Sequence, residues 1–536
     1  MFRLLVLQAR RDRFQLPIWI IGAGLLALTS SSAVGAEFGT EADRANLLKV
    51  AVATPSIIAL RGVPDGASTG SYVFFQVFVY VSMVAAFMSV FFVTRHTRAD
   101  EERGRLELLR STPVGRTAGA VATLVLGVLA NLLLGLVVAL AFIAGGLEAR
   151  GSLLAGLAAA GVGIAFIGIG LLMAQLAPTS RAANGIGSAL VGVAFVLRAA
   201  GDALGEPRAD GLSITSAWPS WLSPIGWGQQ TFAFTKAEAT PLLLLVGLTI
   251  VTVVVAFVLQ ATRDLGSSVI RERDGRAAGR PAFHSNIALV WRMHWPTIVG
   301  WVLGGAVLGA LGGGLANNLA SALTTDSSIT AVIAGLVPGG RGGLADLFVA
   351  AILGIAGVLA AAAGVQAIIR ARSEEVDGRA ELVLAAPVGR IVWLADYLLV
   401  AVLSVLAVAF AAGLACGLTF LVTGSDVDRL WSSIGGGLAQ LPAGLVYVAI
   451  TALLFAFVPR LTIPVGWALL GAGFVVGQLG GLLQLSQGVR DASPFTHTPA
   501  VPTADADWSG AVVLCVIAIV LAGLSIVAVR GREMTA

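Results

Sequence analysis

The chain has 536 residues, of which 57% are hydrophobic and only 12% charged, and its mean hydropathy is +0.90. A soluble protein of this length needs more polar surface, so the composition excludes a soluble globular protein. The net charge of +4 is spread along the chain and does not indicate nucleic-acid binding. The only two cysteines, Cys416 and Cys515, lie in apolar runs and indicate neither a disulfide framework nor a zinc site.

Twelve apolar runs are long enough to cross a membrane as helices. The sequence therefore predicts an all-α polytopic membrane protein with about 12 transmembrane helices. The spans are expected near residues 16–36, 72–94, 119–144, 153–176, 185–203, 241–261, 297–316, 346–369, 393–422, 434–457, 463–483 and 510–529. The first run, ending in SSAVGA, imitates a signal peptide. We expect it to be retained, because the run 297–316 holds the same place later in the chain.

Basic residues are concentrated in alternate loops. The N-terminus, the C-terminus and every second connection carry 24 of the 34 basic residues. The positive-inside rule therefore predicts that both termini of this multi-pass protein are cytoplasmic. Lys49 and Lys236 are the only lysines, and together with the many Ala, Gly and Val residues this suggests a GC-rich bacterial genome, so we expect a bacterial plasma membrane.

One polar pattern occurs twice, in two stretches that we call segment A and segment B. Segment A is RADEERGRLELLRSTPVGR (98–116), and segment B is RSEEVDGRAELVLAAPVGR (372–390). Aligned without a gap, 274 residues apart, they share 10 of 19 residues. Each follows the second of six predicted spans. The pattern predicts two parallel six-helix repeats, residues 1–270 and 271–536.

Each segment has the features of a short helix below the membrane. Glu101 and Arg105, and likewise Glu375 and Arg379, have the spacing of a helical ion pair. Leu106 and Leu109 share an apolar face, which Ala380 and Val383 occupy in segment B, and a proline ends each helix. A charged loop that only anchors two spans is the simpler alternative. We favour a docking surface, because such a loop has no reason to keep the same spacing in both copies.

Two further kinds of segment recur. Residues 1–14 and 286–295 are amphipathic and are expected to rest on the inner leaflet, or simply to set topology as basic flanks. Residues 216–234 and 489–508 precede the last span of each half. Their Trp and Pro content predicts interfacial segments at the outer surface, although a plain loop is the alternative.

The sequence offers no catalytic or metal-binding pattern. A GxxxxGK[ST] phosphate loop is absent, and the longest predicted cytoplasmic loop, 262–296, is too short to form an ATPase. The four histidines lack ligand spacing. Arg198 is expected to snorkel from an outer helix end, and Asp346 and Asp396 lie near span starts. The lack of a deeply placed carboxylate argues against a proton-coupled transporter.

The whole chain resembles the permease subunits of type-2 ABC exporters, in particular the actinobacterial polyketide-antibiotic (tetronasin-like) exporters. The resemblance is carried by EERGRLELLRSTPVGR and EEVDGRAELVLAAPVGR, by the six-plus-six layout, and by the outer WLSPIGW and SPFTHTP motifs. It implies one chain that supplies both transmembrane halves and works with two copies of a separate ABC ATPase subunit. That partner binds ATP and Mg²⁺, while this chain holds no cofactor or metal and is not itself an enzyme. Hydrophobic drugs or antibiotics are the implied substrates.

The resemblance also assigns residues. It makes the two segments coupling helices, with the contact residues Glu101, Gly104, Arg105, Glu107, Pro113, Arg116, Glu375, Gly378, Arg379, Glu381, Pro387 and Arg390. It places spans 2, 5, 8 and 11 at the interface between halves. An asymmetric substrate path is then expected, with aromatic and small residues on opposite walls: Phe74, Phe75, Phe78 and Phe87, and Ala356, Gly357 and Ala360. Lipid contact or helix packing is the alternative for these residues.

A major facilitator-type secondary drug exporter is the alternative for the whole chain. It also has twelve spans in two parallel halves, and ADEERGR resembles its charged loop after span 2. The Pro-Val-Gly-Arg ending, the long outer segments and the missing membrane carboxylates argue against it.

Overall fold

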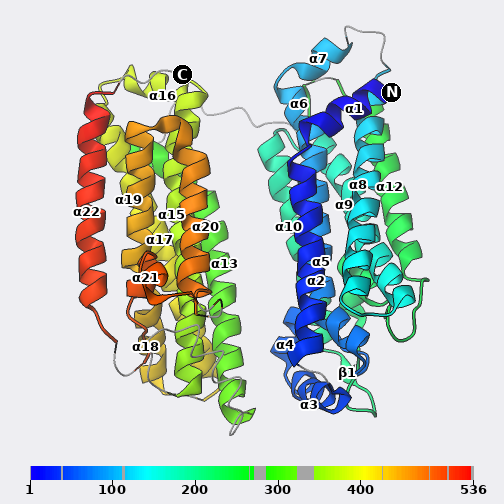
Figure 1. Cartoon of the computed structure of the whole chain (residues 1–536). Helices are drawn as coiled ribbons and strands as arrows, with labels where there is room; N and C mark the ends of the chain where they lie inside the picture. The colour runs from blue at the N-terminus through cyan, green and yellow to red at the C-terminus, as the bar shows by residue number, and fades with distance from the viewer. Residues whose placement is uncertain are drawn as a thin grey trace. The chain divides into compact units, whose positions relative to one another are not determined.

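A computed structural model describes residues 2–37, 40–110, 115–264, 266–270, 285–322, 343–424, 426–481, 483, 485–503 and 506–532. These residues form helices almost throughout, and twelve of the helices are long and apolar enough to span a membrane. The predicted all-α polytopic fold is therefore confirmed. The chain divides into two compact units, Met1–Gly275 (unit 1) and Arg276–Ala536 (unit 2), each of which is a bundle of long helices (Figure 1).

Unit 1 begins with a separate short helix and contains a small β-hairpin. Its elements are α1 (Phe2–Arg11), α2 (Gln15–Glu37), α3 (Glu41–Val52), α4 (Pro55–Arg61), α5 (Thr69–His96), α6 (Arg98–Glu102), α7 (Arg105–Arg110), α8 (Ala118–Ala144), α9 (Ala149–Leu176), α10 (Ser180–Ala203), β1 (Glu206–Pro207), β2 (Ile214–Thr215), η1 (Trp218–Leu222), α11 (Pro224–Gln229) and α12 (Leu242–Thr262). The two strands are antiparallel, with Glu206 opposite Thr215.

Unit 2 has a longer first helix and no strand among its described residues. Its elements are α13 (Asn286–Ala322), α15 (Leu344–Val376), α16 (Arg379–Leu384), α17 (Arg390–Val422), α18 (Val427–Leu438), α19 (Leu441–Phe457), η3 (Pro459–Leu461), α20 (Thr462–Gln478), α21 (Gln487–Arg490), η4 (Pro494–His497) and α22 (Ser509–Arg530). The predicted span 434–457 is thus divided between α18 and α19, with Pro442 in the first turn of α19.

The central helices of each unit are buried over most of their surface. In an apolar stretch of 18 residues in each of α5, α9 and α15, 72% of the residues are buried, against 17% in α12 and 22% in α22. The outer helices leave their apolar side chains to be covered by lipid. Small residues let the helices approach closely: a Cβ added to Gly135 of α8 would lie 2.4 Å from the carbonyl oxygen of Gly156 in α9.

The two amphipathic segments differ from each other. α1 is a separate helix, and its residues Phe2 and Leu7 are exposed, as is Phe14 just after it. In unit 2 the corresponding residues are the first turns of α13, which runs through Pro296 without a break. In unit 2 a single continuous helix therefore forms where the sequence predicts an amphipathic segment, 286–295, followed by a separate span, 297–316.

The segments 216–234 and 489–508 are more deeply buried in their units than the sequence predicts. Ile225 and Ser223 of the 216–234 segment are fully buried, while Trp218 stays 74% exposed. Ser223 begins α11 by accepting a hydrogen bond from the Gly226 amide, and its hydroxyl donates to the carbonyl of Ala194 in α10. Phe495 of the 489–508 segment is also buried. Only part of each segment is therefore free to lie at a membrane surface.

Candidate functional site

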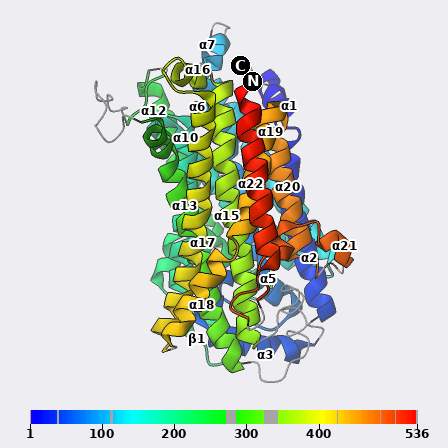
Figure 2. The same cartoon turned by 90° about the vertical axis from the view of Figure 1, so that its left-hand side faces the viewer.

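Segments A and B each turn away from a long helix at a glycine. Gly104 separates α6 from α7 with a φ of +68°, and Gly378 separates α15 from α16 with a φ of +71°. Residues with a side chain rarely adopt this left-handed conformation, which accounts for a glycine at both positions. Both short helices lie at one end of their own unit (Figures 1 and 2). Pro113 lies outside the described residues.

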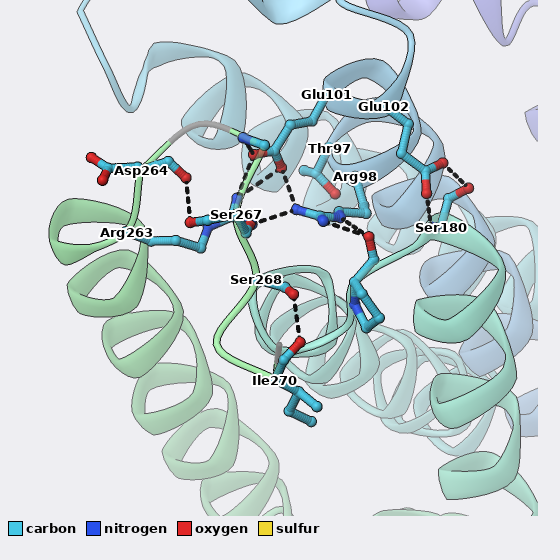
Figure 3. Close-up of polar contacts among 12 residues, drawn as sticks. Thr97, Arg98, Glu101, Glu102, Ser180, Arg263, Asp264, Ser267, Ser268 and Ile270 are labelled. Carbon is cyan, nitrogen blue, oxygen red and sulfur yellow. Dashed lines mark hydrogen bonds and ion pairs between the residues drawn. The ribbon is translucent and has the colours of Figure 1, made fainter. Parts of the chain in front are cut away.

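Glu101 of segment A is almost completely buried in a cluster of hydrogen bonds (Figure 3). Its side chain is 5% exposed. It accepts from Arg98 at 3.0 Å, from Arg263 at 2.7 and 3.0 Å, and from the Gly266 amide at 2.8 Å. Arg263 directly follows α12, the last span of unit 1. The predicted ion pair between Glu101 and Arg105 is therefore wrong: Glu101 is bonded to a different helix end.

Arg98 extends this cluster to a third helix end. Its guanidinium donates to the carbonyl of Pro178, between α9 and α10, at 2.5 and 3.1 Å, and to that of Ser267 at 2.9 Å. The amide of Val269 donates in turn to the carbonyl of Gln175 in the last turn of α9, at 3.3 Å. The ends of α9 and α12 thus meet segment A.

Glu375 of segment B has an equivalent environment. Its side chain is 2% exposed and accepts from Arg372 at 2.8 Å and from Arg532 at 2.5 Å. Arg532 follows α22, the last span of unit 2, and also donates to the carbonyl of Phe455 in α19 at 2.7 Å. The predicted pair with Arg379 is again wrong. In both units the glutamate bonds to an arginine three residues earlier and to one just beyond the last span.

The carboxylates next to these two glutamates in the sequence bind other partners. Asp100 accepts from Arg11 of α1 at 2.7 Å and from Arg105 at 3.2 Å. The corresponding Glu374 accepts from Arg370 at 2.7 Å and from Arg379 at 2.5 Å. In segment A alone, Glu102 caps α10 by accepting from the amide of Ser180 at 2.7 Å and from its hydroxyl at 2.5 Å (Figure 3).

Several candidate contact residues face outward. Glu107, Glu381, Pro387 and Arg390 are exposed. The predicted apolar face of segment B points inward instead: Ala380 is 2% exposed and Val383 packs against the core of unit 2. Within α16 the apolar residue Leu382 is exposed, at 77%. The outward surface of α16 is therefore formed by Arg379, Glu381 and Leu382.

Arg116 is the last residue of segment A and lies just before α8. It donates a hydrogen bond to the carbonyl of Arg263, and its own carbonyl accepts from Gln260 at 3.4 Å. Arg116 and Arg263 line a cavity of about 40 Å³ beneath segment A. Gln175 is buried in its wall, and its side-chain oxygen has no partner among the described residues. This volume is enough for a few water molecules at most.

The residues of the expected substrate path pack inside their own units. Phe74, Phe75 and Phe78 are at most 6% exposed, and the Phe74 ring stacks on that of Phe78 at 4.4 Å. Phe87 is partly exposed. Ala356, Gly357 and Ala360 are buried, and a Cβ on Gly357 would lie 2.6 Å from Gln440. The packing alternative thus describes their contacts within each unit, and the path between units stays a prediction.

A buried ion pair near the far end of α10 was missed by sequence reasoning. Arg198 and Asp202 are both 0% exposed and lie 3.5 Å apart. Asp202 also accepts from Gln229 at 2.9 Å and from Ser216 at 2.8 Å. The prediction that Arg198 snorkels is therefore wrong, and a carboxylate is buried after all. The i, i+4 spacing on one predicted helix was the available signal. Paired in this way, Asp202 is a structural group rather than an isolated proton carrier.

No cluster of three or more His, Cys, Asp or Glu capable of holding a metal ion occurs in the described part of the chain. The site is thus a set of ion pairs at the ends of helices.

Comparison with known proteins identifies the family. The family described as "Multidrug efflux system permease Rv1217c, C-terminal domain" matches residues 3–259 and 283–530. The multidrug efflux system permease protein Rv1217c of Mycobacterium tuberculosis (strain ATCC 25618 / H37Rv) is 32% identical over 504 residues, which cover 94% of this chain and 89% of the relative. With twelve helices in its described part that are long and apolar enough to span a membrane, and a match over nearly its full length, the chain belongs to the Rv1217c family of multidrug efflux permeases.

Proposed function

We propose that the chain is the permease subunit of an ATP-driven ABC exporter, and that segments A and B are its coupling helices. The observation that carries the proposal is the pair of short helices, α7 and α16. Buried carboxylates hold both segments, while Glu107 and Glu381 face outward. Two copies of a separate ATPase subunit would bind ATP and Mg²⁺ and form a symmetric dimer. Such a dimer has two equal clefts, and two similar helices are needed to fill them.

The proposed orientation follows from the arginines. Both termini and both segments are cytoplasmic, in the plasma membrane of a bacterium. Residues 1–270 and 271–536 are two parallel six-span repeats, surrounded by lipid. The substrates are hydrophobic drugs or antibiotics, including polyketide-like compounds. The efflux role of the M. tuberculosis relative supports this substrate class.

The mechanism transmits movement from the ATPase to the spans. Closure of the ATPase dimer on ATP displaces the exposed faces of α7 and α16. Each segment is tied to its bundle, just before α7 or α16, by the buried, charge-assisted hydrogen bonds of Glu101 or Glu375, which are stronger than neutral ones. The displacement therefore reaches the ends of the spans instead of being absorbed in a loose loop. A major facilitator mechanism has no observation in its favour, since the buried Asp202 is already paired with Arg198.

Charge reversal of the exposed glutamates tests the proposal. Glu107→Lys, Glu381→Lys and the double variant should leave the chain folded and inserted, because both side chains are exposed. Co-purification of the ATPase and export from vesicles should fall, most in the double variant. Glu238→Lys is the control, because Glu238 is exposed on the loop before α12, away from the segments. Full ATPase binding and export in the double variant would contradict the proposal, as would a wild-type chain that purifies with no ATPase.

A further inference from the structure

The same three helix ends meet at the buried glutamate in both units. In unit 1 they are the start of segment A, the end of α9 and the end of α12. In unit 2 they are the end of α15, α19 and the end of α22. These are the second, fourth and sixth spans of each unit. The arginine that donates a hydrogen bond to the end of the fourth span is Arg98 in unit 1 and Arg532 in unit 2. In both units, however, the second, fourth and sixth spans are connected.

The chemistry makes each junction strong. A carboxylate that is at most 5% exposed is tolerated only when it is paired and hydrogen-bonded. The loss of Arg532 would leave Oε1 of the buried Glu375 without this hydrogen-bond donor, and the loss of Arg263 would remove two of the hydrogen bonds to Glu101. The second arginine lies 162 residues away in unit 1 and 157 in unit 2. It is therefore a tertiary link between two spans rather than part of the local structure of a loop.

We propose that Arg263 and Arg532 are positioning residues that lock each coupling segment to the cytoplasmic end of the last span in its unit. A movement imposed on segment A or segment B then carries that span with it as one rigid body. This inference rests on the proposed function for what moves the segments. The lock itself is a property of the permease alone.

The first arm of the test measures the lock without any ATPase. Arg532→Gln in the full chain in lipid nanodiscs should raise amide hydrogen exchange in residues 526–532 and 372–378 at least about tenfold, because a buried pair is broken. Arg530→Gln is the matched control, because it removes the same charge two residues away. The Arg530 side chain is exposed, whereas the one that bonds to Glu375 is Arg532. Arg532→Lys should restore only part of the protection, because lysine cannot hold Glu375 and the Phe455 carbonyl as a fork.

The second arm measures transmission in the complex with the ATPase. Arg532→Gln and Arg263→Gln should keep ATPase binding and basal ATP hydrolysis but lose drug-stimulated hydrolysis and export, whereas Arg530→Gln keeps all four. Glu375→Gln preserves the shape of the site and should also lose drug-stimulated hydrolysis and export, so a poorly folding arginine variant does not end the test.

The outcomes separate the two claims. Unchanged exchange in Arg532→Gln would overturn the lock. Raised amide hydrogen exchange together with normal drug-stimulated ATP hydrolysis would show that the lock exists but does not transmit movement to the last span. A wild-type chain that binds no ATPase would defeat the proposed function, while the exchange arm would still decide whether the lock exists.

Discussion

Segments A and B carry nearly the same polar residues, but different side chains pack beneath them. Beneath segment B, Trp393 and Tyr397 are 1% exposed and fill the space, with ring centres 5.0 Å apart. At the corresponding positions beneath segment A, 274 residues earlier, the chain has Gly119 and Thr123. There Gln8 of α1 reaches in to donate to the Thr123 hydroxyl at 3.0 Å, and the cavity of about 40 Å³ remains.

The difference extends to the first helix of each unit. Asp12, after α1, is 2% exposed and accepts from Arg95 at 2.7 Å and from His96. In unit 2, His294 of α13 instead lies edge-on to Tyr397 at 5.5 Å and bonds to backbone carbonyls. Unit 1 thus holds its segment with polar contacts around a cavity, and unit 2 with aromatic packing. The same ion-pair geometry therefore does not require the same core beneath it.

Trp393→Ala should have the largest effect, because it opens in unit 2 a cavity larger than the one already present in unit 1. We expect a loss of about 3–5 kcal/mol in the free energy of unfolding. Thermal unfolding in detergent micelles measures it, with Trp431→Ala as the control, since Trp431 is 65% exposed. Equal losses in the two variants would show that Trp393 does not support the core.

Asp12 should anchor α1 by charge. Burial alone would raise the pKa of Asp12, but the hydrogen bonds and charges of His96 and Arg95 outweigh it, so the pKa lies below its ordinary value of 3.8. The stabilisation is therefore complete above the ordinary pKa and is lost as the pH falls through the lowered one. Asp12→Asn should cost roughly 1–3 kcal/mol at neutral pH.

Hydrogen exchange in residues 2–11, corrected for its intrinsic pH dependence, measures this anchor. Exchange should stay constant from neutral pH to about 4, rise below that, and be raised at every pH in Asp12→Asn. Helix α12 serves as an internal reference, because it contains no titratable side chain. Loosening of α12 to the same extent would mean that acid acts on the whole of unit 1.

Two arginines at matching positions should differ in importance. Arg379 is 47% exposed and donates to both Glu374 and Asp377, while Arg105 is 49% exposed and, among the described residues, pairs with Asp100 at 3.2 Å. Arg379→Gln should cost about 1 kcal/mol and Arg105→Gln less than about 0.5. Chemical denaturation of the two variants checks this, and a larger loss for Arg105 would reverse the comparison.

Gly119→Ala should have the smallest effect, and in the opposite direction. An added Cβ would meet only Leu106, at 3.9 Å, so alanine fits and should stabilise α8 by up to about 1 kcal/mol. Gly135→Ala is the contrasting control, because its Cβ would collide with the Gly156 carbonyl. A destabilised Gly119→Ala variant would show that the space beneath segment A has to stay open.

Much of the fold was predictable because hydropathy is a local property. All twelve spans appear near their expected positions, since each needs only a long run of apolar residues. The glycines of both segments were also identified, although their left-handed conformation was not. The ion pairs were predicted wrongly, because helical spacing suggested Arg105 and Arg379, whereas Arg263 and Arg532 lie in distant parts of the chain.

The sequence by itself determined the membrane-spanning class and the two polar segments, because apolar length and repeated motifs are visible without neighbours. Only the tertiary structure decided which carboxylates are buried and which arginines satisfy them. Glu101 and Glu107 are both charged residues of segment A, yet one is enclosed by the end of α12 and the other is exposed. Burial depends on what packs against a residue, and that packing brings together side chains about 160 residues apart.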